Sequence, residues 1–465
     1  MNREKNLTKE IERSEAVHQF AEEVARLRIE LALAQDQLSS TEHAYGSFVP
    51  REFLHFLEVD NIRDVRLGMH TERMMTVLFS DIRNFTGLSE SMTPQENFDF
   101  LNSYLSQMEP VIVPYRGLID KFIGDAIMAM FPRCADDAVQ GALAMLERLE
   151  KYNRGRARAG YVPIRSGIGV NTGIVMLGTV GGAGRMDTTV IGDSVNLASR
   201  LEGLTKVYNT PLLISEHTLH SLEDPGRYGI RFLGRSRVKG KQDAQAVYEV
   251  FDADPPLLRA AKKRTCKRFE EALAYFYTGS PEKAQPRLVR CLQEAPNDQP
   301  ALVYLERCDE FMRTNHVHGL DPIEFEQTWS DDYTSNIGDV DSQHRTLLMN
   351  MNNLSIAVRD GKTPLALSLL ADIGADAKHH CTMEEDLMHE FGYPLKRVHA
   401  EQHQRFYQHL SAVHGQIAAE TESPTCMAFR VRLLLIDWLI NHSIKADRHF
   451  GQHLNSRSGA RSASH

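Results

Sequence analysis

The sequence predicts a multidomain chain with an N-terminal coiled-coil helix, an α+β domain built on a mixed sheet with helices, an α-helical connector and a C-terminal four-helix bundle. Three observations lead to this order. Apolar residues repeat in a heptad near the start, β-rich segments alternate with helical ones in the first half, and long helical segments crowded with histidines fill the last third. The expected boundaries are 1–44, 45–252, 253–318 and 319–452, with a disordered tail over 453–465.

The first element is a heptad seam in the first forty residues. Its members alternate in steps of three and four: Val17, Phe20, Val24, Leu27, Leu31, Ala34 and Leu38. Three heptads of this kind predict a parallel dimeric coiled coil. A single amphipathic helix packed on the next domain stays open as the alternative.

Two aspartates dominate the α+β region. Asp81 ends an apolar run in which Met75–Phe79 predicts a buried strand, and Asp125 follows a glycine in a two-residue turn between the predicted strands Leu118–Ile123 and Ala126–Phe131. Carboxylates at a strand end and at a neighbouring hairpin tip can converge on Mg²⁺, which binds through few carboxylates together with substrate phosphates. Both could be ordinary turn aspartates, and a single Asp next to Gly, taken alone, is more typical of such a turn.

A third segment, DTTVIGDSVNLASRLEGLTK at 187–206, predicts a short strand and then a helix that Asp193 or Ser194 caps. Asn196 and Arg200 are spaced i,i+4 on that helix and therefore share one face. Apolar residues occupy much of the rest, so this polar pair interrupts an otherwise buried helix.

Four segments, TVLFSDIRNFTGLSE, DKFIGDAIMAMF, TVIGDSVNLASRLE and VKGK, together resemble the class III nucleotidyl cyclase catalytic domain over about residues 45–252. The resemblance implies attack of the ribose 3′-oxygen on the α-phosphorus with pyrophosphate as leaving group. It also implies a head-to-tail homodimer in which Asp81 and Asp125 of one protomer face Lys121, Thr189, Asn196, Arg200 and Lys239 of the other.

The resemblance assigns a role to each site residue. Asp81 and Asp125, with the backbone carbonyl of Ile82, would hold two Mg²⁺ or Mn²⁺ ions. The remaining groups would meet the nucleotide: the backbone amides of Asn84, Phe85 and Thr86 the phosphates, Arg200 the α-phosphoryl oxygens, Asn196 the ribose and Lys239 the terminal phosphates. Lys121 and Thr189 stand where the family recognises the base, and this pair is typical of adenylate cyclases, so ATP is expected over GTP.

Histidines with regular spacing mark the C-terminal region. His380 and Glu384 are spaced i,i+4, as are His399 and His403, while His442 and Asp447 are spaced i,i+5. Helices are expected at about 343–358, 363–390, 395–416 and 425–447, and facing helices that project such ligands inward can build a dinuclear metal site. A lone histidine on an apolar face is more typical of a core, but here the spacing recurs.

With His344, these residues resemble the five-histidine, two-carboxylate ligand set of hemerythrin. The resemblance implies two Fe ions per domain, bridged by Glu384 and Asp447, with one iron position open for O₂. Cys381 departs from the family, which usually has Phe beside the second histidine. Zinc or an empty bundle stays open.

Composition narrows the remaining possibilities. A net charge of −9 without a basic stripe argues against nucleic-acid binding, and no stretch approaches the ~20 apolar residues of a membrane span. The charged start and six cysteines without paired spacing favour a cytoplasmic protein. The connector resembles one tetratricopeptide-like helical pair, which is too small to bury much by itself.

The combined prediction is a homodimeric adenylate cyclase controlled by O₂ or redox state at a di-iron centre. Two alternatives stay open. The first is an iron- and O₂-binding protein with an inactive cyclase scaffold; the second is a cyclase that responds to NO or peroxide.

Overall fold

The computed structural model describes residues 20, 23–41, 51–182, 184–237, 244–315, 323–420 and 422–462. The chain forms two compact units. The larger consists of residues 73–175 and 191–465, and the smaller of residues 1–72 and 176–190.

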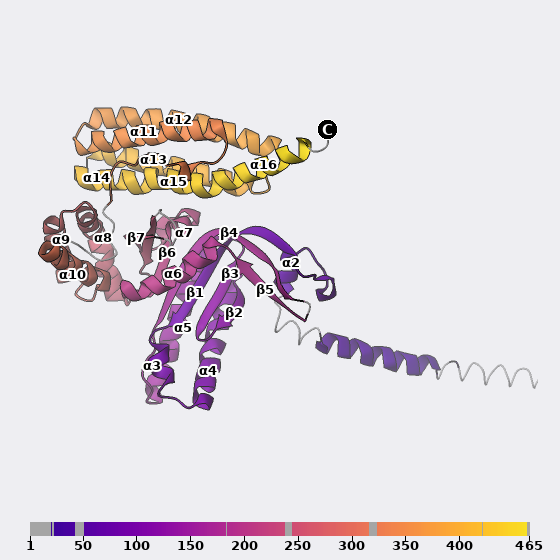
Figure 1. The fold of residues 1–465 in the computed structure, drawn as a ribbon. Coiled ribbons are helices and arrows are strands. Elements are labelled where there is room, and N and C mark those ends of the chain that lie inside the picture. The colour runs from indigo at the N-terminus through magenta and orange to yellow at the C-terminus, as the bar shows by residue number, and fades with distance from the viewer. Residues whose placement is uncertain are drawn as a thin grey trace, which may run out of the picture. The chain divides into compact units, whose positions relative to one another are not determined.

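One mixed sheet organises the first half of the chain (Figure 1). Its strands are β1 His70–Ile82, β2 Leu118–Ile123, β3 Ala126–Phe131, β4 Ser166–Gly182, β5 Arg185–Ile191, β6 Leu212–Ser215, β7 Ile230–Arg237 and β8 Ala244–Val250. The order is β2-β3-β1-β4-β6-β8-β7, and β5 pairs with β4. Strands β4 and β6 run parallel, whereas β1–β3, β2–β3, β6–β8 and β7–β8 are antiparallel. The predicted mixed sheet is confirmed.

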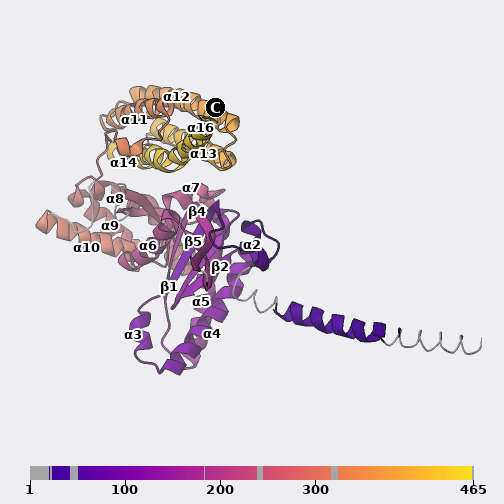
Figure 2. The ribbon, with the colours of Figure 1, turned by 45° about the vertical axis from the view of Figure 1, so that its right-hand side comes forward.

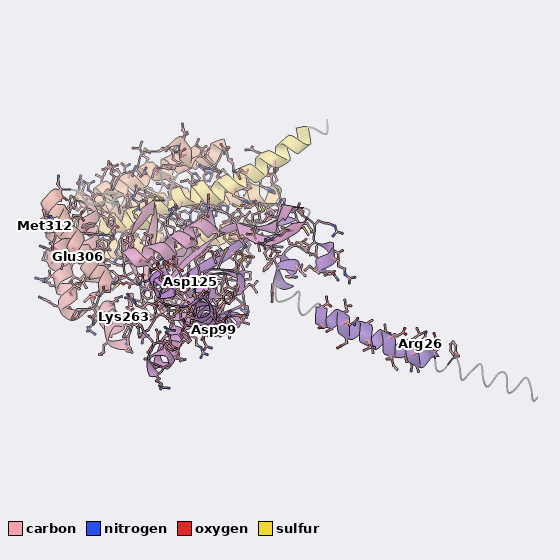
Figure 3. All side chains as sticks on the ribbon, turned by 60° about the horizontal axis from the view of Figure 1, so that its bottom comes forward. Arg26, Asp99, Asp125, Lys263, Glu306 and Met312 are labelled. Atoms are coloured by element: carbon pink, nitrogen blue, oxygen red, sulfur yellow. The ribbon has the colours of Figure 1, made fainter. Side chains whose placement is uncertain are left out.

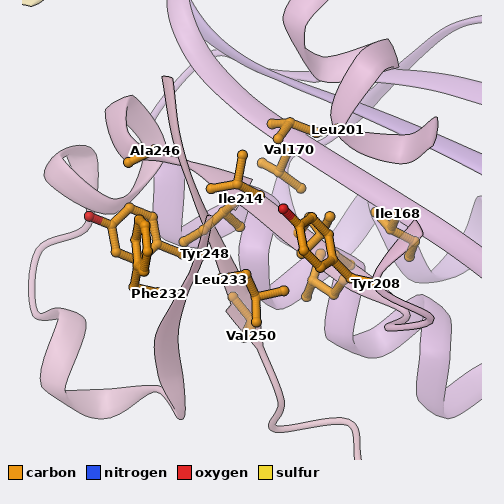
Figure 4. Packing of buried hydrophobic residues seen from close by; sticks show 14 of the residues in the cluster. Ile168, Val170, Leu201, Tyr208, Ile214, Phe232, Leu233, Ala246, Tyr248 and Val250 are labelled. Carbon is orange, nitrogen blue, oxygen red and sulfur yellow. The ribbon is translucent and has the colours of Figure 1, made fainter. Parts of the chain in front are cut away.

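The helices of this part of the chain are α2 Arg51–Phe56, α3 Phe85–Ser89, α4 Pro94–Ile112, α5 Ala135–Arg158, α6 Asp193–Val207 and α7 Glu216–Ser221. Helix α4 starts at a capping box, in which the Thr93 side chain bonds the amide of Glu96 and the Glu96 side chain returns a bond to the backbone of Thr93. Helix α6 lies on β6, where Leu201, Val170 and Ile214 join one continuous core (Figure 4).

The connector contains three helices, α8 Pro256–Tyr277, α9 Pro281–Glu294 and α10 Gln299–Thr314. They pack on β7 and β8, and one core joins them to the sheet. Arg231 of β7 is fully buried there, with both terminal nitrogens on Asp298 at 2.6 and 2.8 Å and its Nε on Glu249 at 2.7 Å. The connector therefore packs as part of the sheet domain. The predicted single helical pair did not include this packing.

The C-terminal region is helical. Its helices are α11 Gly338–Arg359, α12 Thr363–Glu390, α13 Lys396–Ala419, α14 Pro424–Val431, α15 Asp437–His442 and α16 Arg448–Ser462, with π-helical turns η5 Arg432–Ile436 and η6 Ser443–Asp447 between the last three. Helices α11, α12 and α13 lie side by side in two views (Figures 1 and 2) and share one apolar core. The predicted helix positions are confirmed within a few residues.

The predicted disordered tail is wrong over 453–462, because α16 continues to Ser462. Leu454 packs against the apolar cluster of Met388, Tyr393 and Phe450, and His453 Nε2 lies 3.3 Å from the carbonyl oxygen of Phe391. These contacts stabilise the start of this extension of the last helix, and composition alone does not predict them.

The smaller unit contains a helix over 23–41, α2 and the outer half of the β4–β5 hairpin. The amide of Thr179 donates to Met69 at 2.9 Å, and its carbonyl accepts from Gly68 at 3.2 Å. The heptad residues Leu27, Leu31 and Leu38 are 52%, 59% and 47% exposed, and Val17 lies outside the described residues. The coiled coil stays a prediction.

Candidate active site and metal centre

The hairpin that carries Asp125 has the predicted form. Strands β2 and β3 pair antiparallel, and Gly124 takes a φ of +65°, a left-handed value that glycine adopts without strain. Asp81 is the penultimate residue of β1, next to β3 in the sheet. The Ile82 amide donates to Asp125 Oδ2 at 3.1 Å, so the two predicted metal carboxylates meet at one end of neighbouring strands (Asp125 is labelled in Figure 3).

The electrostatics of this pair fit a cation site. Burial, followed by the hydrogen bond and negative charge of Asp81, raises the pKa of Asp125 to about 6. Two neighbouring carboxylates disfavour each other's ionisation because their negative charges repel, and a bound cation would favour the ionised form of both. Lys206 at the end of α6 already supplies one positive charge, since its Nζ lies 3.0 Å from Asp81 Oδ2. No motif in the sequence points to Lys206, which lies thirteen residues after the start of α6.

A cleft of about 1340 Å³ opens beside the two aspartates. Its lining includes Asp81, Ile82, Asn84, Phe85, Thr86, Asp125 and Lys206. Asn84 takes a left-handed conformation with φ 56° and precedes α3 without a side-chain cap. The first amides of α3, from Phe85 and Thr86, belong to the helix end that lacks intrahelical acceptors. The predicted metal and phosphate groups therefore share one cleft.

The predicted Asn196 and Arg200 lie on α6 but do not line this cleft. Asn196 is exposed and Arg200 is half-buried. The predicted cap on this helix is wrong: the N-cap is Gly192, with φ 151°, and not Asp193 or Ser194. Only glycine adopts this backbone geometry readily, so the helix begins one residue earlier than the sequence suggested.

The predicted base-recognition residues also lie outside the cleft lining. Lys121 is on β2, with its side chain 33% exposed and its Nζ 3.6 Å from Asp120 Oδ2. Thr189 is on β5 in the smaller unit and is half-buried. Lys239 lies outside the described residues.

In the C-terminal region, seven predicted ligands converge in two groups. Glu384, His399, His403 and His442 form one, and His344, His380 and Asp447 form the other; within each group the potential ligand atoms lie within 4.8 Å of one another. All seven residues are buried. The Nε2 atoms of His399 and His442 are 3.0 Å apart, and those of His344 and His380 are 3.3 Å apart. Imidazole nitrogens this close either share a hydrogen bond or could coordinate a common cation.

The carboxylates Glu384 and Asp447 lie between these imidazoles. Asp447 Oδ1 is 3.0 Å from His442 Nε2 and 3.1 Å from His399 Nε2, while Oδ2 is 3.2 Å from His344 Nε2. Despite these distances, none of the four carboxylate oxygens has a hydrogen bond of acceptable geometry within the described part of the chain. Unsatisfied carboxylates at complete burial fit metal bridging far better than a polar core.

The outer nitrogens of four imidazoles have fixed partners. The Nδ1 atoms of His344, His380, His403 and His442 lie 2.9–3.1 Å from Ser443 Oγ, Gln343 Oε1, Glu385 Oε1 and Gln402 Oε1, respectively. Metal-bound histidines are typically oriented in this way, since a bond to one nitrogen presents the other to the metal. The sequence pattern does not predict these partners.

Burial favours neutral imidazoles at two positions, as metal ligation requires. Burial lowers the pKa of His380 to about 3 and that of His442 to about 4. Burial alone would raise the pKa of Glu384, but the facing His399 and His403 lower it below its ordinary value. Burial on its own would also lower the pKa of His399 and His403, but Glu384, joined at His403 by Cys381, raises the pKa of each above its ordinary value. Imidazole nitrogen together with ionised carboxylate is a donor set that suits a divalent transition metal.

The i,i+5 spacing of His442 and Asp447 needs a structural explanation. In an α-helix, at 3.6 residues per turn, five residues separate two side chains by about 140° around the axis. Here residues 443–447 form the π-helical turn η6, whose extra residue per turn lets both side chains reach the cluster. Four supporting helical segments therefore contribute to one buried centre.

Comparison with known proteins identifies the sheet domain. Residues 67–250 match the family model described as the adenylate and guanylate cyclase catalytic domain. An adenylate cyclase of Anabaena cylindrica is 40% identical over 244 residues, 51% of this chain and 49% of that protein. The terminal-differentiation-specific adenylate cyclase of Dictyostelium discoideum is 35% identical over 288 residues, 61% of this chain and 14% of that protein.

The chain thus covers less than half the length of either relative. A crystal structure of the adenylyl cyclase CyaB from P. aeruginosa is 34% identical and covers 39% of this chain and 96% of that one, with a TM-score of 0.35. Among the residues that the structure describes, no helix has both the length and the apolar composition needed to cross a membrane. The match over residues 67–250 shows that this part of the chain is a class III adenylate/guanylate cyclase catalytic domain.

Proposed function

We propose that the chain is an adenylate cyclase that forms 3′,5′-cyclic AMP and pyrophosphate from ATP, and that a hemerythrin-like di-iron centre in its C-terminal region regulates it. The observation that supports the catalytic half best is the shared cleft of Asp81, Asp125 and the start of α3. It joins two carboxylates to a helix end suited to phosphate.

Each cleft residue has a role in the reaction. Two divalent ions, when bound, would lower the pKa of the ribose 3′-hydroxyl and neutralise the triphosphate. Asp81 and Asp125, with the Ile82 carbonyl, would hold these ions. The amides of Phe85 and Thr86 would orient the phosphates for in-line attack.

The remaining roles fall to a second protomer. Asn196 and Arg200 are outside the cleft that holds the carboxylates, and Asn196 is exposed. A head-to-tail homodimer would bring the pair of one chain to the cleft of the other. Arg200 would then stabilise charge on the α-phosphoryl oxygens, Asn196 would orient the ribose, and Lys239 would meet the terminal phosphates.

ATP is the proposed substrate because two relatives at 40% and 35% identity are adenylate cyclases and because of two residues, Lys121 on β2 and Thr189 on β5. Lys121 would donate to an adenine ring nitrogen, where guanine presents a donor of its own, and Thr189 would complete the contact. Replacing Lys121 with Glu is expected to lower ATP turnover more than GTP turnover.

The test of catalysis is ATP turnover by the full chain with Mg²⁺ or Mn²⁺. Asp81→Asn is expected to reduce the rate by at least ~100-fold, since a metal carboxylate would be lost. Asp99→Asn changes an exposed aspartate on α4 and serves as the matched control. If the wild type makes no cyclic nucleotide in any iron state, the alternative of an inactive dimerisation scaffold replaces this proposal.

The regulatory half of the proposal rests on the buried seven-residue cluster. Five histidines, two unsatisfied carboxylates and four oriented imidazoles fit two iron ions in a hemerythrin-like four-helix bundle. A di-iron pair in such a site, when bound, would supply reversible O₂ binding. His399, His403 and His442 would hold one ion, His344 and His380 the other, and Glu384 and Asp447 would bridge them.

Two adjacent glutamates on α12 provide a matched test of the metal centre. Glu384 is fully buried and points into the cluster, whereas Glu385 bonds the outer nitrogen of His403 at 2.9 Å. Glu384→Gln is expected to lose bound iron, from two ions per chain to one or none. Glu385→Gln should keep two ions with affinity weakened by ~10–100-fold. Equal iron content in Glu384→Gln and wild type would remove the di-iron assignment.

Regulation is tested by measuring cyclase rates on anaerobic, reduced, iron-loaded protein before and after O₂ is added. A rate that changes with O₂ supports the sensor. Equal rates would leave a cyclase whose metal centre answers another signal, and the same measurement with NO or peroxide separates these alternatives.

A further inference from the structure

Helix α15, which carries His442, contacts the cyclase domain through the preceding residue, Asn441. Asn441 Oδ1 accepts from Gln245 Nε2 of β8 at 2.6 Å, and Asn441 Nδ2 donates to Glu216 Oε2 at the start of α7 at 3.2 Å. The exposed fractions of Asn441, Gln245 and Glu216 are 8%, 3% and 1%. Water therefore has little access to replace a broken bond, and each partner depends on the other.

The next turn of the same helix adds a second contact. Lys445 lies between His442 and Asp447, and its Nζ donates to Gln245 Oε1 at 3.0 Å and to His217 Nε2 at 2.7 Å. Asn441 and Lys445 therefore share one short helical segment with the candidate metal ligands His442 and Asp447.

From Glu216 the contacts continue to the catalytic helix. Ser215, directly before Glu216, donates from Oγ to Asn171 Oδ1 at 2.7 Å. Asn171 Nδ2 donates to the backbone oxygen of Ser194 at 2.8 Å, in the first turn of α6. Asn171 and Ser215 are 2% and 0% exposed. Helix α6 carries the candidate pair Asn196 and Arg200, so its first turn is held by this buried chain of bonds.

A cavity of about 410 Å³ borders this chain at both ends, with His442 and Asn441 on one wall and Asn171 and Ser194 on another. Space next to buried polar groups allows them to exchange partners, which a close-packed core would prevent. Glu216 Oε1 lines this region without a hydrogen-bond partner among the described residues and is available for such an exchange.

We propose that Asn441, Gln245, Glu216, Ser215 and Asn171 form a relay that positions α6 according to the state of the metal cluster. The relay rests on the proposed function for its signal, but its structural part is independent of it. Each member is a positioning residue, because it acts on Asn196 and Arg200 through Ser194 and not on the nucleotide.

The structural part is tested by hydrogen exchange on the full-length protein. Asn441→Ala is expected to speed exchange of the α6 amides at 195–200 by about fivefold, the factor that one lost buried hydrogen bond represents. Glu216→Ala should do the same, while Glu216→Gln keeps an oxygen that accepts from Asn441 and should restore the wild-type rate. Unchanged exchange at 195–200 in both alanine variants would overturn the relay.

The matched control is Asn350→Ala, which removes a bond to Asp376 Oδ2 at 2.9 Å within the C-terminal region. It is expected to leave α6 exchange unchanged; acceleration equal to that in Asn441→Ala would mean general loosening and would overturn the relay.

Cyclase rates with and without O₂ on the same variants separate the two proposals. Asn441→Ala should retain bound iron and its absorption spectrum, while the ratio of its cyclase rate with O₂ to its rate without O₂ falls toward one. A wild-type ratio of one, with faster α6 exchange in Asn441→Ala, refutes O₂ regulation and keeps the relay as a structural link. A full wild-type ratio in Asn441→Ala refutes the relay and keeps regulation.

Discussion

Complementation between two inactive variants gives a direct test of a site shared between protomers. Asp81→Asn removes a cleft carboxylate, and Arg200→Ala removes a side chain of α6 that does not line the same cleft. If the site takes Asp81 from one protomer and Arg200 from the other, each pure variant has two defective sites. A mixed dimer then carries both substitutions in one site and none in the other.

The expected magnitude follows from this geometry. Equal amounts of the two chains, assorted at random, give about half mixed dimers, each with one intact site of two, so about a quarter of wild-type activity returns. Each pure variant should retain less than ~1%. The recovered activity should thus exceed either background by more than tenfold.

The assay is cyclic AMP formation by co-expressed chains with two different affinity tags, purified through both tags in turn. Doubly purified mixed dimers should reach about half the wild-type rate per dimer. Asp81→Asn co-expressed with itself is the control. Background activity in the doubly purified sample would refute the reasoning, because it would place Arg200 and Asp81 in the site of a single protomer.

Three further outcomes are expected. Lys206→Met removes the cation that pairs with a cleft carboxylate at 3.0 Å; since Lys206 is half exposed, the apparent Mg²⁺ activation constant should fall only ~2–5-fold in a metal titration of turnover. Because the pKa of Asp125 is raised to about 6, the folded metal-free protein favours the protonated carboxyl, and the contribution of this group to stability is lost as pH rises through about 6. Cation affinity measured by calorimetry should therefore weaken ~tenfold per pH unit below about 6. An affinity independent of pH between 4 and 6 would contradict this. Asp298→Ala leaves the buried Arg231 without its paired carboxylate and should lower the free energy of unfolding in denaturant by ~3–5 kcal/mol. Asp309→Ala, on the exposed face of α10, should lower it by under ~1 kcal/mol. Similar losses for both variants would disprove the burial argument.

Local patterns predicted the elements that carry the chemistry. The glycine before Asp125 marked the hairpin because a two-residue turn needs its left-handed conformation, and the turn has that conformation. Helix α12 begins and ends where periodicity placed it, at 363 and 390. These features depend on neighbours in the sequence, so a single chain shows them. The predicted cap of α6 is wrong because Gly192 and Asp193 both fit the start of a helix, and only the backbone conformation decides between them.

Features that depend on distant contacts escaped prediction. Lys206 reaches Asp81 across 125 positions, and Arg231 finds Asp298 across 67. The tail after 453 has no apolar pattern of its own, yet Leu454 finds a cluster built by α12 and the following turn. Pairing of this kind is set by tertiary packing, which neither composition nor periodicity encodes.

The spacing of His442 and Asp447 shows how local and distant information combine. Read as an α-helix, the i,i+5 interval would point the two side chains in different directions and weaken the case for a metal site. The π-helical turn η6 resolves this, and π turns are typically retained where function requires them. The same turn also directs Lys445 to Gln245 and His217, while Asn441 just before it reaches Glu216. One irregular turn thus serves the candidate metal centre and the contact with the cyclase domain at once. An ordinary α-turn could keep one of these arrangements but would rotate the other out of place, so the extra residue of η6 has a structural role.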